Sequence, residues 1–172
     1  FTKLIPGLLS DSGKQNAVCS PVNIYMALAM LAETTDGSSR EQILSLLGTA
    51  DMESLRTQAK QVWLGHYNND GLTTSILGNS LWLDDAYAFK QATADRLAET
   101  YYASSFNGDL GTDEANQKLQ DWLNQNTAGL LQEQAKKVEL DPESVFALAS
   151  TIYFSASWEN EFDENDTADG IF

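Results

Sequence analysis

The chain has 172 residues, of which 42% are hydrophobic and 10% aromatic, and its formal net charge is −15. This length and composition predict one globular domain, residues 1–172, with a buried core, and they exclude a disordered polyampholyte. The negative charge argues against nucleic acid and anionic membrane surfaces as partners. No apolar run approaches membrane-spanning length, and the first residues, FTKLIPGLLSDSG, lack the layout of a signal peptide, although a signal removed earlier is compatible with the sequence.

The first predicted elements are a short apolar strand at 16–19 and a helix that begins at Pro21. Ser20 is well placed as the N-cap of this helix. Pro21 suits the first helical position, because the N–H that proline lacks has no helical partner there. Apolar residues then surround the helix on nearly every side, which predicts that it is buried.

Gly37 suits the left-handed conformation that often follows the end of a helix. The next residues, SSREQ at 38–42, form a capping-box pattern, which predicts a second helix over 41–47 that Gly48 closes. A third helix is predicted over 51–64. Farther along, the patterns predict a strand over 74–85, a helix over 89–101, a strand over 104–110, and a helix that Thr112 caps and that ends near 127–129.

The last predicted element is SVFALASTIYF, a continuous apolar run that predicts a central strand buried on both faces. Alternation gives it a face of mostly small residues (145, 147, 149, 151 and 153) and a bulky face (146, 148, 152 and 154). Ser150 interrupts the bulky face. A buried hydroxyl without a partner costs about 1–3 kcal/mol, so Ser150 is expected to have one. Helices outnumber strands, and the fold class is α+β.

Cys19 and His66 are the only cysteine and the only histidine, so the chain offers one candidate pair for nucleophilic catalysis. Cys19 lies in an apolar segment, where a thiol is usually inert, and His66 lies beside a polar turn. A zinc site, a P-loop, a G-x-G-x-x-G motif and a G-x-S-x-G motif are all missing from the sequence. Ser20 has no base beside it that would activate it as a nucleophile. The sequence therefore predicts no catalytic site and no cofactor.

A calcium site built from Asp163, Asn165 and Asp169 is disfavoured, because the ordered ligand spacing and the closing glutamate of a hand motif are missing. Binding of heparin-like polyanions is also disfavoured. The stretch 51–64 carries only Arg56 and Lys60 as cations, and Lys136 and Lys137 are too few to add a basic surface.

Four segments in order resemble the N-terminal half of a serpin, a family of protease inhibitors. Residues 16–44 resemble the strand that leads into helix B, followed by helix C. Residues 78–85 resemble strand 2 of the large sheet A, and 118–131 resemble helix F with its Thr-x-Gly exit. Residues 144–162 resemble strand 3 of sheet A and the tryptophan that marks the top of that sheet, here Trp158. The resemblance implies a serpin fold with the region of helices A–F, strands 1–3 of sheet A and one strand of sheet B. The implied fold is incomplete in this chain, so the resemblance also implies the C-terminal half of the same protein as a partner.

The resemblance also suggests a role for the polar residues at the start of the first helix. In serpins, polar residues there lie under sheet A and bond to the middle of strand 3, in a region called the shutter. This carries over onto Ser20, Asn23 and Ser150, with Asn23 where serine is usual and Ser150 where asparagine is usual. We interpret the pair as a compensated exchange, in which amide and hydroxyl still bond. Gln120 replaces a frequent asparagine, and Glu161 replaces a frequent proline.

Serpins typically inhibit serine or cysteine proteases once: the protease cleaves a reactive loop, which inserts into sheet A as a new strand. That loop is not present in this chain. The resemblance thus implies an endopeptidase inhibitor that is not an enzyme, in which Trp158 marks where insertion begins, and it implies secretion. Two alternatives stay open: a non-inhibitory serpin acting as a carrier or chaperone, which the sequence of the loop's hinge would decide, and an unrelated α+β hydrolase or binding domain.

Overall fold

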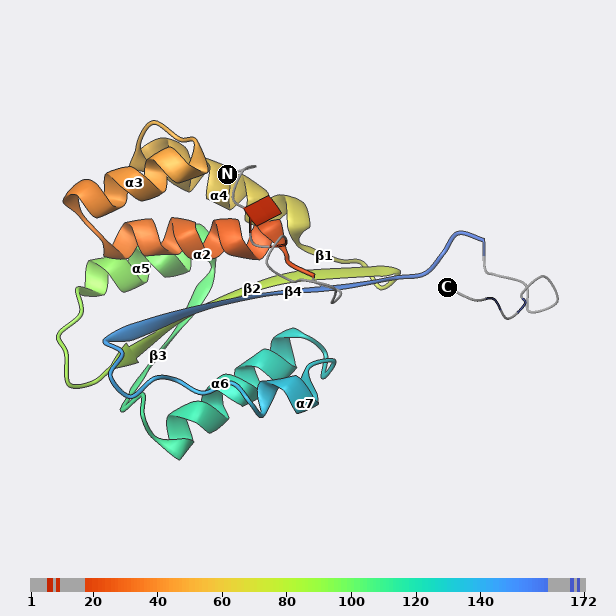
Figure 1. The fold of residues 1–172 in the computed structure, drawn as a ribbon. Coiled ribbons are helices and arrows are strands. Elements are labelled where there is room, and N and C mark those ends of the chain that lie inside the picture. The colour runs from red at the N-terminus through yellow and green to blue at the C-terminus, as the bar shows by residue number, and fades with distance from the viewer. Residues whose placement is uncertain (1–5, 8, 10–17, 161–167, 169, 171–172) are drawn as a thin grey trace.

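A computed structural model of the chain describes residues 6, 7, 9, 18–160, 168 and 170 (Figure 1). The helices are α2 (Pro21–Thr34), α3 (Gly37–Leu47), α4 (Met52–His66), α5 (Gln91–Tyr101), α6 (Asp113–Asn126) and α7 (Gln132–Ala135). The strands are β1 (Asn68–Asn69), β2 (Thr73–Asp84), β3 (Ala103–Gly108) and β4 (Phe146–Ala156). Within the described residues, no helix combines the length and apolar character needed to cross a membrane.

Strand β2 is the centre of one mixed sheet. It pairs with β3 in parallel on one side, and with β4 antiparallel on the other. The register with β4 is continuous from Thr73 opposite Ala156 to Leu83 opposite Phe146. Short β1 pairs with the beginning of β2. Among the described strands β4 has β2 as its one neighbour, so its other edge is open.

Two helical layers cover the sheet, with α2–α5 on one face and α6 with α7 on the other (Figure 1). The predicted alternation of side chains along the last strand, β4, places one of its faces against each helical layer. Phe146, Leu148 and Ile152, from the bulky face, pack against the larger core under α2, α4 and α5. Ala147 and Ala149, from the small face, pack against the smaller core under α6. Small side chains on that face allow the helix to lie close to the sheet.

The start of α2 follows the sequence prediction, since Ser20 is its N-cap and Pro21 its first residue. The predicted start of the next helix is wrong. Helix α3 begins at Gly37 with Asp36 as its N-cap, and the Asp36 carboxylate accepts a hydrogen bond from the Gly37 N–H at 2.8 Å. A carboxylate that already satisfies the first free N–H makes the SSREQ capping box unnecessary. Gly37 does adopt a left-handed φ of +54°.

Two further expectations need correction. The described part of the predicted strand at 16–19, Val18 and Cys19, lies in no strand, and the other two residues lie outside the described part of the chain. The strand over 146–156 is only half-buried along most of its length, and its last three residues are exposed. Both faces of the strand pack against helices, as its continuous apolar pattern predicted, but its outer edge has no neighbour among the described strands and its end extends past the helices (Figure 1).

Candidate functional site

Ser20 and Asn23 form a reciprocal pair at the beginning of α2. The Ser20 hydroxyl donates to Asn23 Oδ1 at 2.7 Å, and Ser20 Oγ accepts from the Asn23 backbone N–H at 3.3 Å. The cap is thus local, since both residues lie in the first turn of one helix. It also orients the Asn23 side chain, because it occupies the amide oxygen and directs the NH₂ group away from the helix end.

The free NH₂ group of Asn23 contacts the middle of the last strand, β4. Asn23 Nδ2 donates to the backbone carbonyl oxygen of Ser150 at 2.8 Å. The structure therefore brings Ser20, Asn23 and Ser150 together. We expected the Asn23 amide to bond to the Ser150 hydroxyl, and this is wrong, because the amide donates to the main-chain carbonyl of Ser150. The Ser150 hydroxyl is buried and has no hydrogen-bond partner among the described residues. The role of the three residues in sheet opening stays a prediction.

The contacted carbonyl lies on the open edge of β4. The Asp84 N–H donates to the Val145 carbonyl, so these two residues form a hydrogen-bonded pair of the antiparallel ladder. Such pairs alternate with pairs whose N–H and C=O groups point away from each other. Counting along the continuous register, Ser150 opposite Asn79 is a pair of the second kind. Asn23 thus donates to an acceptor that another strand, added at this edge, would use.

Asn79 extends the polar centre of the sheet toward β3. Its side-chain NH₂ donates to the Tyr101 carbonyl at 2.8 Å, while its amide oxygen is buried and unpaired in the described structure. An unpaired buried polar atom costs about 1–3 kcal/mol, so Asn79 is a costly residue for the middle of a buried strand. The sequence reasoning missed Asn79. The available signal was a polar residue in the middle of an otherwise buried strand.

The remaining candidate residues lie apart from this centre. Trp158 follows the end of β4 and is 72% exposed. Cys19, just before α2, is half-buried, and His66 is the last residue of α4, where its Nδ1 lies 2.7 Å from the Val62 carbonyl oxygen. Gln120, in the middle of α6, donates through Nε2 to the Val138 carbonyl, which follows α7. The ligands of the disfavoured calcium site, 163, 165 and 169, lie outside the described residues, as does Glu161. Within the described part, no three acidic, histidine or cysteine side chains are grouped so that they could hold a metal ion.

Comparison with known proteins gives one consistent result. The sequence profile described as "Serpin (serine protease inhibitor)" matches residues 2–172. Serpin-ZX of Arabidopsis thaliana is 26% identical over 166 residues, which cover 94% of this chain and 42% of that protein. The chain thus spans less than half the length of this relative.

Solved structures give the same fold. The Arabidopsis serpin AtSerpin1, in its native stressed conformation, superposes with a TM-score of 0.85 at 24% identity, over 98% of this chain and 44% of that one. Reactive-loop-cleaved human thyroxine-binding globulin has the same TM-score at 22% identity, over 97% of this chain and 50% of that one. The predicted α+β fold of the N-terminal serpin half is confirmed.

Proposed function

The chain belongs to the serpin family, and on that premise we propose that the protein containing it inhibits serine or cysteine endopeptidases by strand insertion. Serpins typically act as protease inhibitors and are not catalysts, so the chain is not an enzyme. In the proposed reaction the protease nucleophile attacks a peptide bond of the reactive loop. An ester or thioester forms to the loop carbonyl, and the amine on the other side of the bond leaves. The cleaved loop then adds to the sheet beside β4, and the attached protease is displaced before water can hydrolyse the ester.

The observation that carries this proposal is the bond from Asn23 to the Ser150 carbonyl of β4, on the edge that has no neighbour among the described strands. A strand with free main-chain groups is a template for strand addition. The register assigns those groups to residues 146, 148, 150, 152 and 154. Because Asn23 Nδ2 bonds to the Ser150 carbonyl, an incoming strand must share or displace this contact. We therefore assign Asn23 to the control of sheet opening, and Trp158 to the end of the sheet at which insertion begins.

The reactive loop and the strands that complete the sheet are assigned to the part of the protein that relatives have beyond this length. The proposed partners are thus the C-terminal half of the same polypeptide, which would supply those strands, and the target protease as the external partner. Because the loop sequence lies elsewhere, the protease class follows from experiment and not from these residues.

The test uses the full-length protein and a panel of serine and cysteine proteases, analysed on a denaturing gel. Inhibition predicts a band at the summed mass of protease and protein fragment that survives boiling, since the two are joined covalently. Cleavage of the loop without such a band, across the whole panel, contradicts inhibition and favours a carrier or chaperone. Secretion is a separate proposal, based on family analogy, which fractionation of the source cells and their medium would test.

A further inference from the structure

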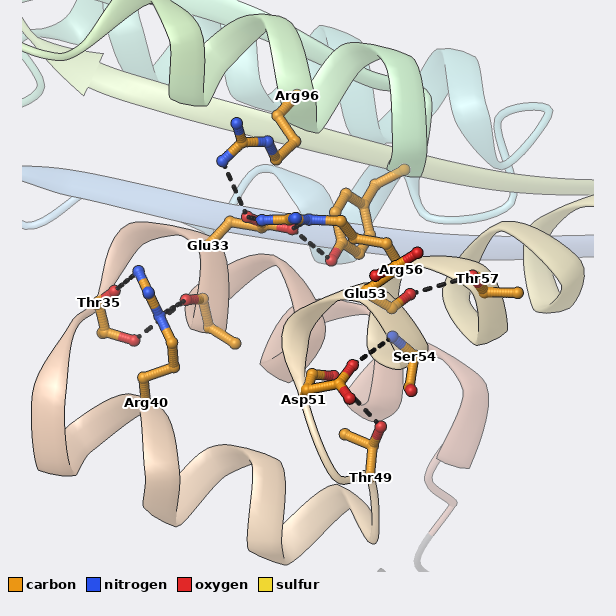
Figure 2. Close-up of polar contacts among 12 residues, drawn as sticks. Glu33, Thr35, Arg40, Thr49, Asp51, Glu53, Ser54, Arg56, Thr57 and Arg96 are labelled. Carbon is orange, nitrogen blue, oxygen red and sulfur yellow. Dashed lines mark hydrogen bonds and ion pairs between the residues drawn. The ribbon is translucent and has the colours of Figure 1, made fainter.

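The one charged residue of α2, Glu33, is buried among three helices. Its side chain is 1% exposed. Arg56 of α4 donates to it through both arms of the guanidinium, with Nε 2.7 Å from Oε1 and Nη2 2.9 Å from Oε2. The Tyr101 hydroxyl, from the end of α5, donates to Oε1 at 3.1 Å, and Arg96 Nη1 lies 3.7 Å from Oε2. Figure 2 shows Arg56 and Arg96 reaching Glu33 from two different helices.

This arrangement satisfies the carboxylate in a place where an unpaired charge would be very costly. Both oxygens are bonded, and the bidentate contact fixes the relative orientation of α2 and α4, because a guanidinium fork matches a carboxylate in only a few geometries. The hydrogen bonds to Glu33 raise the pKa of the Arg56 guanidinium above its ordinary value. An apolar cluster of similar volume could be as stable or more so, so stability alone does not explain a buried ion pair.

Helix α2 carries this cluster at one end and the contact to β4 at the other. Asn23 lies in the first turn and Glu33 in the last, about 15 Å apart at 1.5 Å per residue. Arg40 of α3 adds to the fixed end, since its guanidinium donates to the backbone carbonyls of Ala32 and Thr35 (Figure 2). The end of α2 at Glu33 is therefore bound to α3, α4 and α5, whereas the end at Asn23 faces the strand whose edge is open.

We propose that Glu33 is a positioning residue for sheet opening, holding α2 fixed on α4 and α5 so that Asn23 stays on the Ser150 carbonyl. The inference rests on the proposed function, because it concerns the same strand addition. A rigid helix transmits position along its axis, so a loosened end at Glu33 displaces Asn23 as well. The contact at β4 then breaks more often, and the sheet opens more readily without a protease.

The test compares hydrogen exchange of peptides covering 146–156 in full-length wild type and Glu33→Gln, which keeps the side-chain size and removes the charge. We expect these amides to exchange about tenfold faster in Glu33→Gln, corresponding to about 1.4 kcal/mol of opening free energy. The matched control is Glu114→Gln, which breaks an exposed pair with the same 2.7 Å separation, from Lys118 Nζ to Glu114 Oε1. Exchange in that control should stay within about twofold of wild type. If Glu33→Gln does not fold, the same measurement is made on Arg56→Lys, because lysine keeps the positive charge and cannot form the bidentate contact with the Glu33 carboxylate.

A double-mutant cycle with Asn23→Ala separates positioning from general destabilisation. If Glu33 acts through Asn23, adding Glu33→Gln to Asn23→Ala does not accelerate the exchange further. Residues about 15 Å apart that share no contact otherwise have additive effects, so multiplied rates would overturn the proposal. So would a lowered melting temperature with unchanged exchange at 146–156. The exchange measurement needs no protease. If the wild type forms no covalent complex with any protease, the proposed function is contradicted, but the double-mutant cycle still tests whether Glu33 acts through Asn23.

Discussion

Gly78 shows how a single position sets the distance between α6 and the sheet. A Cβ added at Gly78 would lie 2.6 Å from Asn126 Oδ1 and 2.8 Å from Thr151 Oγ1. Thr151 is buried, and its hydroxyl has no partner among the described residues. The missing side chain therefore lets polar groups of α6 and β4 come close over the backbone of β2, and any larger residue must move one of them.

We predict that Gly78→Ala lowers the free energy of unfolding by about 1–3 kcal/mol, since the new methyl group overpacks this contact. The measurement is urea unfolding of the full-length protein. Gly65→Ala is the control, because a Cβ there meets nothing within 4 Å and Gly65 lies inside helix α4. That change should stabilise by about 0.4–1 kcal/mol. Equal effects of the two substitutions would show that close packing at Gly78 is unimportant.

The burial of Tyr101 leads us to expect that the folded protein loses stability in alkali. Burial, and then the neighbouring Glu33 carboxylate, raise the pKa of Tyr101 well above its ordinary value of 10.0. Above pH 10 the unfolded chain releases this proton while the folded protein keeps it. The folded state then binds more protons, so its stability is complete below pH 10 and falls as the pH rises further.

Unfolding free energies at pH 8 and pH 11 measure this effect. From pH 8 to pH 11 the wild type should lose about 1 kcal/mol more than Tyr101→Phe, which has no phenolic proton to retain. Tyr87→Phe, at a residue that is 56% exposed, is the control and should behave as wild type. The same alkaline loss in wild type and Tyr101→Phe would contradict the assignment.

Among the elements, α2 connects the two features that bear on function. Its cap orients Asn23 toward β4, and its last turn carries Glu33. Ser20 therefore differs from an ordinary cap such as Thr112 of α6, whose hydroxyl oxygen accepts from the Ala115 N–H at the same 3.3 Å. Both satisfy one free N–H of a helix start, but only Ser20 also holds a side chain that contacts the sheet.

Ser20→Ala and Thr112→Ala should each lower stability by about 1 kcal/mol through loss of the cap. Only Ser20→Ala should also accelerate hydrogen exchange at 146–156, because it frees the Asn23 side chain. Thermal unfolding and exchange, measured on both variants, check this. Faster exchange at 146–156 in Thr112→Ala as well would mean that exchange follows overall stability.

The elements could be predicted where their determinants are local. The period of apolar residues, the cap at Ser20 and the turn at Gly37 and Gly48 lie within a few residues of the elements that they define. The start of α3 was missed because Asp36 and the two serines after Gly37 are all residues that cap helices, and in the structure Asp36 is the N-cap. The acceptor of Asn23 and the partners of Glu33 could not be predicted from pattern, since they join residues 127 and 23 positions apart. A single glutamate in an apolar helix was the available signal.

At the scale of the whole chain, the sheet is covered on both faces, and one of its edges has no neighbour among the described strands. The two cores lie on opposite sides of β2, one under α2, α4 and α5 and the other under α6. Neither core covers the outer edge of β4, and Phe154 near its end is 67% exposed. An exposed apolar edge strand pairs readily with other chains.

Residues 1–172 expressed alone should therefore self-associate, and co-expression with the remaining part of the protein should suppress this. Light scattering at micromolar concentration measures the effect. Phe154→Lys should reduce the association of the isolated piece, since a charge at an exposed edge position opposes pairing. A monodisperse monomer at the same concentration would contradict this view of the edge.

The most direct test of the central claim is the melting temperature of the full-length protein before and after cleavage of its reactive loop. Insertion of the loop beside β4 completes the sheet and releases stored strain, so the account predicts a melting temperature at least about 10 °C higher after cleavage. An unchanged or lower melting temperature, with the loop cleaved in full, would contradict strand addition at this edge.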